Sequence, residues 1–282
     1  MINFNGSLFS EDKEVLTHAN RGLKYGDALF ETLRCVNGTL FFWEDHYFRL
    51  MASMRMLRME IPMEFTLEFL EEEIKKNIRE NNLENRAARV RLTVFRKEGG
   101  LYLPESNDVS YIIETSLLDS PFYIIGENEY EVELFKDYYV NKDLLSTLKT
   151  TNTILNVVAS VYAKENRYAN CLLVNTDKQV VEAINGNLFL VKGNTIKTPP
   201  LGDGCLNGII RKKLMEIIET TEEFQMVEES ISPFELQKAD ELFITNSIVG
   251  IQPISKYRKK DFSNTVAKKL VGKLNAKARM AS

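Results

Sequence analysis

The sequence has few cysteines, few histidines and no excess of basic charge, and each shortage excludes a class of protein. Cys35, Cys171 and Cys205 lie far apart and form no CxxC pair, which indicates reduced thiols in a cytoplasmic protein rather than a disulfide framework. The two histidines, His18 and His46, are too few and too far apart to indicate a metal site. A net charge of -4 gives no sign that the chain binds nucleic acid or a membrane surface.

Long apolar runs are also missing. No stretch is long enough to cross a bilayer, and the residues after Met1 lack the basic region and apolar run of a signal peptide. Repeats and low-complexity segments are absent too. What remains is a normal globular mixture, 44% hydrophobic and 27% charged over 282 residues, which is long enough for two domains with cores of their own.

The first part of the chain predicts an α+β domain over residues 1–118. The pairs Asn5-Gly6 and Asn37-Gly38 predict tight hairpin turns. Apolar residues at helical spacing predict two helices, with Asp45 as the N-cap of the first, and alternating apolar and polar residues predict strands. The helices are expected at about 45–59 and 65–81, and the longer strands at 29–36, 89–95 and 109–117.

A linker at 119–123, containing Ser120-Pro121, separates this domain from a second one at 124–282. The second domain is mostly β with flanking helices, and Ser232-Pro233-Phe234-Glu235 is a capping box at a helix start. Its helices are expected at 153–165, at about 209–220 and at the basic C-terminus. Its strands are expected at 132–135, 171–175, 180–184, 187–191, 195–198, 241–245 and 251–254.

Lys149 is the residue around which the candidate chemistry is organised. It lies just before the expected helix at 153–165, among apolar residues and hydroxyls, and the nearest other charge is Asp143. Partial desolvation of such a lysine lowers its pKa and leaves a neutral amine that can attack a carbonyl. The commoner alternative for this stretch alone is a surface lysine near a helix start.

Three other features suit a phosphorylated aldehyde cofactor. Gly208 precedes a helix, whose first N–H groups and dipole favour a phosphate. Arg49 can supply the fixed positive charge that a phosphate dianion needs. Glu182 lies on an expected strand between apolar residues, where a carboxylate usually has a cationic partner. That partner is a protonated pyridine nitrogen or, more commonly, an arginine.

Five segments, in chain order, resemble the signatures of the class IV aminotransferases, the fold-type IV pyridoxal-phosphate enzymes. The first reads NRGLKYGDALFET from residue 20 and continues at 45–50; the others are 149–152, 181–189, 198–211 and 239–253. The resemblance runs from about residue 20 to residue 254. It implies a two-domain fold, with a smaller N-terminal α/β sandwich and a larger C-terminal β-rich domain with flanking helices.

The resemblance also implies a role for each site residue. Lys149 would hold pyridoxal 5'-phosphate through a Schiff base and afterwards move a proton, and Glu182 would keep the pyridine nitrogen protonated. The phosphate would be held by Arg49, the N–H groups of Ile209 and Ile210, and the Ser247 hydroxyl, while Leu206 would pack against the ring.

Family members are homodimers that act on small amines or amino acids, so a homodimer is expected here. The residues Phe41, Phe42 and Trp43 are expected to supply an apolar surface patch for it. His46 is expected on the helix surface or as a hydrogen-bonding residue beside Arg49. No metal is implied.

Comparison with the branches of the family reduces the number of candidate reactions. D-amino-acid aminotransferases place a tyrosine where this chain has Phe30, which argues against that activity. Ile210, where many transaminases have threonine or serine, and Asn246 narrowly favour 4-amino-4-deoxychorismate lyase, which releases pyruvate and 4-aminobenzoate.

Two alternatives to the lyase stay open. Arg91 is suited to bind a substrate carboxylate, as in a branched-chain aminotransferase, and Phe30, Arg91 and Asn246 are the candidate substrate-binding residues. A catalytically silent protein that binds pyridoxal phosphate is an alternative of another class. Intact Lys149 and Glu182 argue against it.

Overall fold

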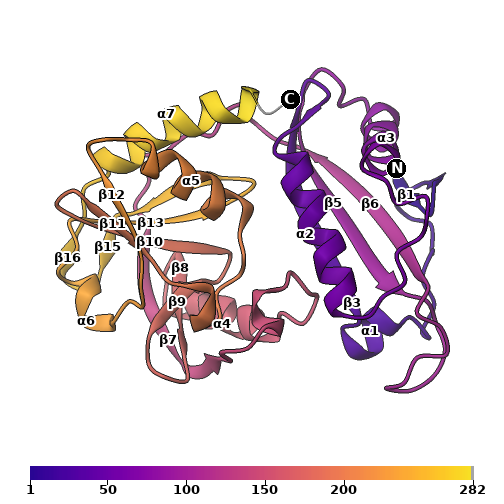
Figure 1. The fold of residues 1–282 in the computed structure, drawn as a ribbon, viewed down its shortest axis with the longest axis horizontal. Helices are drawn as coiled ribbons and strands as arrows, with labels where there is room; N and C mark the ends of the chain where they lie inside the picture. The colour runs from indigo at the N-terminus through magenta and orange to yellow at the C-terminus, as the bar shows by residue number, and fades with distance from the viewer. Residues whose placement is uncertain (281–282) are drawn as a thin grey trace. The chain divides into compact units, whose positions relative to one another are not determined.

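The chain forms two compact units in a computed structural model that describes residues 1–280 (Figure 1). Of the described residues, unit 1 comprises Met1–Pro121, Lys149–Asn152 and 278–280, and unit 2 comprises Phe122–Leu148 and Thr153–Lys277. The boundary at Pro121 falls inside the expected linker at 119–123. The segment Lys149–Asn152, in contrast, clusters with unit 1 although the sequence places it in the second domain.

Unit 1 is built on a six-stranded antiparallel sheet in the order β2-β1-β6-β5-β3-β4. Its elements are β1 (Ile2–Phe4), β2 (Ser7–Phe9), α1 (Arg21–Tyr25), β3 (Ala28–Val36), β4 (Thr39–Leu40), α2 (Trp43–Met56), α3 (Leu67–Glu80), β5 (Ala87–Arg96) and β6 (Val109–Leu117). The two predicted Asn-Gly turns are confirmed: Asn5, Gly6, Asn37 and Gly38 all have positive φ, as a tight hairpin turn between twisted strands requires.

The core of unit 1 lies between this sheet and the helices α2 and α3. Along β5 the residues Val90, Leu92 and Val94 are fully buried, which confirms the predicted alternation. The helices bury an apolar stripe against them: Leu50 and Met54 from α2, and Leu70, Ile74 and Ile78 from α3.

The start of α2 differs from the prediction. The helix begins at Trp43 and its N-cap is Phe42, so Asp45 lies within the first turn and the predicted Asp45 cap is wrong. The reason is burial, because Phe41, Phe42 and Trp43 are all less than 7% exposed and anchor the chain in the core. They therefore do not form the expected surface patch. Asp45 in the first turn still suits the helix dipole.

Unit 2 is built on a ten-stranded mixed sheet in the order β12-β11-β10-β9-β8-β7-β15-β16, with β13 pairing to β10 and β14. Its strands are β7 (Glu131–Val140), β8 (Asn170–Asn175), β9 (Val180–Ala183), β10 (Gly186–Lys192), β11 (Thr195–Thr198), β12 (Gln225–Glu228), β13 (Glu241–Asn246), β14 (Gly250–Ile254), β15 (Lys256–Tyr257) and β16 (Lys260–Asp261). Its helices are η1 (Leu145–Thr147), α4 (Ile154–Glu165), η2 (Leu201–Asp203), α5 (Ile209–Glu219), α6 (Pro233–Leu236) and α7 (Thr265–Met280), whose last residues cluster with unit 1.

The central strands of unit 2 are buried on both faces, which explains their continuous apolar sequences. On β8, Leu172 and Val174 join one core cluster, whereas Cys171 and Leu173 join another that α4 covers. The predicted capping box at α6 is confirmed, with Ser232 and Glu235 bonding each other's backbone N–H and Pro233 at the first helical position.

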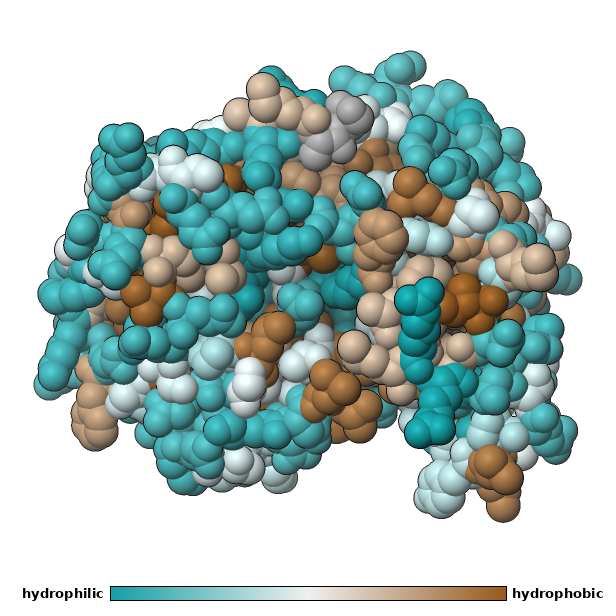
Figure 2. Space-filling model, viewed as in Figure 1, coloured by the Kyte–Doolittle hydropathy of each residue, from teal (hydrophilic) through white to brown (hydrophobic). Residues whose placement is uncertain are grey.

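Figure 2 shows that hydrophilic side chains cover most of the visible face, with apolar side chains in small separate groups. None of the helices in residues 1–280 is long and apolar enough to span a membrane.

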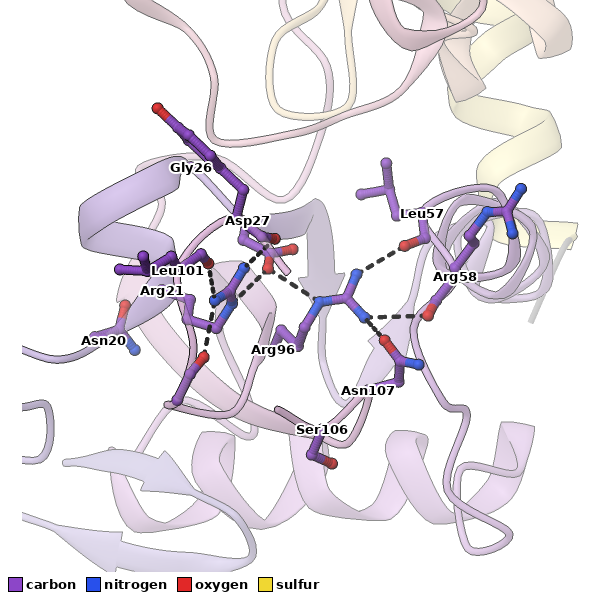
Figure 3. Close-up of polar contacts among 12 residues, drawn as sticks. Asn20, Arg21, Gly26, Asp27, Leu57, Arg58, Arg96, Leu101, Ser106 and Asn107 are labelled. Carbon is purple, nitrogen blue, oxygen red and sulfur yellow. Dashed lines mark hydrogen bonds and ion pairs between the residues drawn. The ribbon is translucent and has the colours of Figure 1, made fainter. Parts of the chain in front are cut away.

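A buried charge cluster in unit 1 connects segments that are distant in sequence (Figure 3). Asp27 Oδ2 accepts hydrogen bonds from Arg21 Nε at 2.9 Å and from Arg96 Nε at 3.0 Å. Arg21 also donates to the carbonyls of Gly99, Leu101 and Tyr102, and Arg96 to those of Leu57 and Arg58. Asp27 therefore holds two buried guanidinium groups that fix the loop after β5 and the end of α2.

We expect Asp27→Asn to lower the free energy of unfolding by about 3 kcal/mol, because it leaves two buried cations without a carboxylate. Urea denaturation measures this. Asp108→Asn is the matched control: Asp108 forms an exposed pair with Lys97, so its loss is expected to cost less than about 1 kcal/mol. Equal effects of the two substitutions would contradict the structural role of Asp27.

Candidate functional site

Lys149 is held beside the start of β3 by backbone pairing within unit 1. Phe30 N–H donates to the Lys149 carbonyl at 2.9 Å, and Thr151 N–H donates to the Ala28 carbonyl at 3.0 Å. The side chain of Asn152 adds a hydrogen bond to the Gly26 carbonyl at 3.0 Å. These contacts form an antiparallel bridge that fixes the backbone of the candidate lysine.

The Phe30 ring contacts two cations of the site. Lys149 Nζ lies 4.4 Å from the ring centroid and Arg91 Cζ lies 3.8 Å from it. Arg91 is oriented further by a hydrogen bond from its Nε to Thr93 Oγ1 at 3.3 Å. Burial lowers the pKa of Arg91, but an arginine stays charged at neutral pH. The structure thus brings Phe30, Arg91 and Lys149 together.

Arg49 lies on α2 and is bound by the carboxylate of Glu31, which lies on β3. Arg49 Nε donates to Glu31 Oε1 at 2.8 Å, and Arg49 Nη2 donates to Glu31 Oε2 at 2.5 Å. His46 Nδ1 lies 2.6 Å from the same Oε2. Glu31 is 1% exposed and His46 is fully buried, so His46 is a hydrogen-bonding residue and not a surface one.

The charge states of these three residues follow from their surroundings. Burial alone raises the pKa of Glu31, but the charge of Arg49 and the hydrogen bond with His46 outweigh it and lower the pKa to about 2. Glu31 is therefore a carboxylate that only accepts hydrogen bonds. Burial lowers the pKa of His46, the hydrogen bond and the charge of Glu31 raise it, and Arg49 and Lys149 lower it further, so that the pKa lies below its usual value. His46 is consequently neutral at pH 7, with its proton on Nδ1.

In unit 2, Glu182 and Asn187 hold the loop that carries Leu206. The Leu206 N–H donates to Glu182 Oε2 at 3.0 Å, and Asn187 Nδ2 donates to the Leu206 carbonyl at 2.8 Å. Glu182 on β9 and Asn187 on β10 are directly paired residues. Two neighbouring strand positions therefore fix both backbone groups of Leu206.

Gly208 is the N-cap of α5, which brings Ile209 and Ile210 to the helix start. Neither N–H has a partner inside the helix, so both can donate to an anion. A Cβ at Gly208 would lie 2.0 Å from Asn187 Oδ1, so only glycine fits this close approach. Arg211 donates to the Pro199 carbonyl and to Glu228, which ties the helix to the preceding loop.

Asn246 and Ser247 lie at the turn between β13 and β14. Asn246 Oδ1 accepts from the N–H groups of Ile248 and Val249, and its Nδ2 donates to the Asn185 carbonyl. These contacts give Asn246 a role in shaping the turn that carries Ser247. The Ser247 carbonyl accepts from the Tyr123 hydroxyl at 3.2 Å, which secures the turn from the other side.

In unit 1, the amine of Lys149 and the guanidinium groups of Arg49 and Arg91 suit an aldehyde and an anion. In unit 2, taken by itself, the glycine-capped helix α5 suits an anion and the Glu182 carboxylate suits a cationic group. The close approach of Asn187 to Gly208 leaves the start of α5 as bare backbone, which is what an anion site at a helix end requires. Within residues 1–280, no group of three or more acidic, histidine or cysteine residues is arranged to hold a metal ion.

The comparison with known protein families decides the class. A family model described as amino-transferase class IV matches residues 28–257. This chain belongs to the class IV aminotransferase family. That match confirms the resemblance drawn from the five segments, and the relatives in the family are enzymes, either transaminases or lyases.

Similar proteins include members of two branches of the family. A Methanocaldococcus jannaschii protein, provisionally assigned as a branched-chain-amino-acid aminotransferase, is 29% identical over 98% of this chain and 94% of its own. The solved 4-amino-4-deoxychorismate lyase of Pseudomonas aeruginosa is 26% identical, with a TM-score of 0.82 over 98% of each chain. The branched-chain aminotransferase of the archaeon Thermoproteus uzoniensis, solved with norvaline, is 24% identical, with a TM-score of 0.88 over 99% of this chain and 94% of that one. The solved structures confirm the predicted fold class.

Glu31 was not among the site residues expected from the sequence, although a signal for it is present. Along β3 the residues Leu29, Glu31 and Leu33 are buried and alternate with partly exposed ones. A carboxylate at an inward position of an alternating strand needs a cationic partner, which is the argument that singled out Glu182. The partner, Arg49, becomes visible only when α2 packs on β3.

We expect the wild type to lose more stability than His46→Asn between pH 7 and pH 5, by up to about 2 kcal/mol. In the folded protein the pKa of His46 is below its usual 6.5. As the pH falls below 6.5, the unfolded chain therefore binds a proton at His46 more readily than the folded chain does. Stability then falls by up to about 1.4 kcal/mol per pH unit, and asparagine cannot titrate.

Urea denaturation of both proteins at the two pH values measures this difference. His18→Asn, at the exposed histidine, is the matched control and is expected to keep the wild-type pH dependence. A wild-type slope in His46→Asn would show that folding does not lower the pKa of His46.

Proposed function

We propose that this protein is a pyridoxal 5'-phosphate-dependent enzyme whose reaction is the lyase cleavage of 4-amino-4-deoxychorismate to pyruvate and 4-aminobenzoate. The family membership supports the cofactor. The observation that carries the lyase is Ile210, an apolar, 1% exposed residue at the helix start where many transaminases have a hydroxyl. The similarity to the lyase of Pseudomonas aeruginosa points in the same direction.

In this proposal, a few named groups would hold the phosphate and the ring. The guanidinium of Arg49, the N–H groups of Ile209 and Ile210, and the Ser247 hydroxyl would bind the phosphate. Leu206, whose backbone is fixed by Glu182 and Asn187, would pack against the ring. The Glu182 carboxylate would keep the pyridine nitrogen protonated.

When bound, the cofactor supplies an aldehyde that condenses with amines and a protonated ring that accepts electrons. Lys149 Nζ would hold the aldehyde covalently, and the substrate amine would displace it. The freed Lys149 amine would take the proton from the ring carbon that bears the substrate amine, and the C–O bond to the enolpyruvate group would break. The released enol would take up a proton to become pyruvate, and the ring would become aromatic. Arg91, stacked on Phe30, binds a substrate carboxylate.

A second candidate is transamination of branched-chain amino acids. It is favoured by Arg91, a half-buried guanidinium suited to an α-carboxylate, and by the similarity to the Methanocaldococcus jannaschii protein over 98% of this chain. In this case Lys149 would return the proton to a different carbon, and no bond to a leaving group would break. A catalytically silent protein would bind the cofactor without either turnover.

We further propose that the enzyme acts as a homodimer in the cytoplasm. The free, buried thiols of Cys35, Cys171 and Cys205 support a reducing compartment. Burial raises the pKa of each, to about 11 for Cys35 and Cys171 and about 12 for Cys205, so they are unreactive at neutral pH. The dimer rests on the family alone, since the residues Phe41, Phe42 and Trp43 belong to the core.

Borohydride treatment of the protein with pyridoxal phosphate is expected to leave a reduced adduct on Lys149, seen by mass spectrometry of the peptide. Lys149→Ala is expected to lose both the adduct and the absorbance of the bound aldehyde, because the amine that forms the bond is gone. Lys142→Ala, at a lysine paired with Asp177, is the control and should keep both. An adduct that persists in Lys149→Ala would show that another lysine holds the cofactor.

With 4-amino-4-deoxychorismate, we expect pyruvate and 4-aminobenzoate to form with a higher kcat/KM than amine transfer from leucine to 2-oxoglutarate. The reason is the apolar Ile210 in place of a hydroxyl at the phosphate. Lys149→Ala supplies the background rate for both assays. The opposite ranking would assign the enzyme to the aminotransferases, and turnover of neither substrate above background would contradict both candidates.

A further inference from the structure

The side chain of Glu31 forms hydrogen bonds that have no part in any step of the proposed reaction. Its carboxylate is fully inside unit 1 and binds two residues of α2, with Oε1 bonded to Arg49 and Oε2 to both Arg49 and His46. The Glu31 side chain is 2% exposed and that of Arg49 is 9% exposed. A buried carboxylate is costly unless it is paired, and here a full cation pairs with it.

The pair fixes the orientation of the Arg49 guanidinium. Two parallel N–H···O bonds from Nε and Nη2 hold one edge of the planar group, so neither rotation in the plane nor tilting out of it is free. His46 limits the carboxylate in turn, because its neutral Nδ1–H donates to Oε2. The opposite edge of Arg49 is therefore presented in one direction.

We propose that Glu31 is a positioning residue for Arg49, which aligns the outer edge of the guanidinium with the phosphate group of the bound ligand. This proposal rests on the proposed function, in which Arg49 binds that phosphate. Glu31 itself touches neither the cofactor nor the substrate. Its effect is therefore confined to ligands that carry a phosphate.

The sign of the effect follows from two opposing contributions. The charge of Glu31 repels a phosphate dianion, but Arg49 stands bonded to Glu31 and neutralises that charge. When glutamine replaces the carboxylate, one of its two acceptor oxygens becomes an amide donor. Arg49 and His46 then lose part of their bonding to this position, and a half-satisfied buried network does not keep its geometry. Loss of alignment therefore outweighs relief of repulsion, and phosphate binding weakens.

The experiment compares two aldehydes that differ only in the phosphate. Protein freed of cofactor is titrated with pyridoxal phosphate and, separately, with pyridoxal, and the Lys149-dependent absorbance gives each dissociation constant. Glu31→Gln is expected to weaken pyridoxal phosphate roughly tenfold, the change that about 1.4 kcal/mol produces, and to leave pyridoxal unchanged. A merely structural role would weaken both aldehydes alike.

Two further variants make the comparison specific. Glu73→Gln is the matched control, since Glu73 is a largely buried carboxylate of the same unit that bonds Asn3 and lies outside the site; it should change neither constant. Glu31→Gln added to Arg49→Met should weaken pyridoxal phosphate no further than Arg49→Met alone, because the effect acts through Arg49.

Each other outcome overturns the proposal. Equal weakening of both aldehydes, tighter binding of pyridoxal phosphate, or no change in Glu31→Gln contradicts the positioning role while the proposed function stands. A wild type that forms no adduct with either aldehyde overturns the proposed function and this proposal together. If Glu31→Gln does not fold, Glu31→Asp replaces it, because aspartate keeps the charge but has a shorter side chain. Glu31→Asp is expected to weaken pyridoxal phosphate and not pyridoxal. Equal binding of pyridoxal phosphate by Glu31→Asp and the wild type would contradict the proposal.

Discussion

The position of Lys149 depends on one short antiparallel bridge at the start of β3. The hydrogen bonds from Phe30 to Lys149 and from Thr151 to Ala28 are the contacts by which Lys149–Asn152 clusters with unit 1. The residues on either side of this segment belong to unit 2. Gly26 is required here, because its φ of +64° is left-handed and a Cβ would lie 2.2 Å from the Asn152 side-chain oxygen. The candidate lysine is therefore placed by backbone pairing rather than by its own side chain.

Because side chains alternate between the two faces of β3, this strand places residues of the candidate site on both faces. Phe30 points to the face where Arg91 and Lys149 lie, whereas Glu31 points into the core, where α2 brings Arg49. A shift of one residue in the pairing of β3 with β5 would exchange the two faces and place a carboxylate against Lys149. The uninterrupted register from Ala28 to Val36 with β5 prevents that shift. Strand register is thus the constraint that separates the amine of Lys149 from the guanidinium of Arg49.

Much of the fold could be predicted because its signals are local. The Asn-Gly turns and the Ser232 capping box depend on residues within a few positions of one another, and the alternation along β5 depends on one buried face. The prediction of Asp45 as the N-cap of α2 was wrong because burial of Phe42 and Trp43 outweighs the local preference for an aspartate cap. Glu31 was missed for a related reason, since its partners come from α2. Of the three candidate substrate-binding residues, Phe30 and Arg91 lie close to Lys149. The side chain of Asn246 instead accepts hydrogen bonds from the turn that follows it, and no pattern in the sequence indicates these bonds.

The residues that would hold the cofactor do not by themselves choose the reaction. Both candidate reactions need an amine that holds an aldehyde, a proton acceptor at that amine and a bound substrate carboxylate, and under the proposed function Lys149 and Arg91 would supply these in either case. The two reactions differ in the step after the proton is lost. Transamination requires the proton to return to another carbon at a held position, while the lyase needs only that the pyruvate group leave, after which aromatisation makes the step irreversible. Under the proposed function Lys149 and Arg91 serve either reaction. The difference that favours the lyase is therefore the apolar side chain of the buried Ile210 at the start of α5, rather than its backbone N–H.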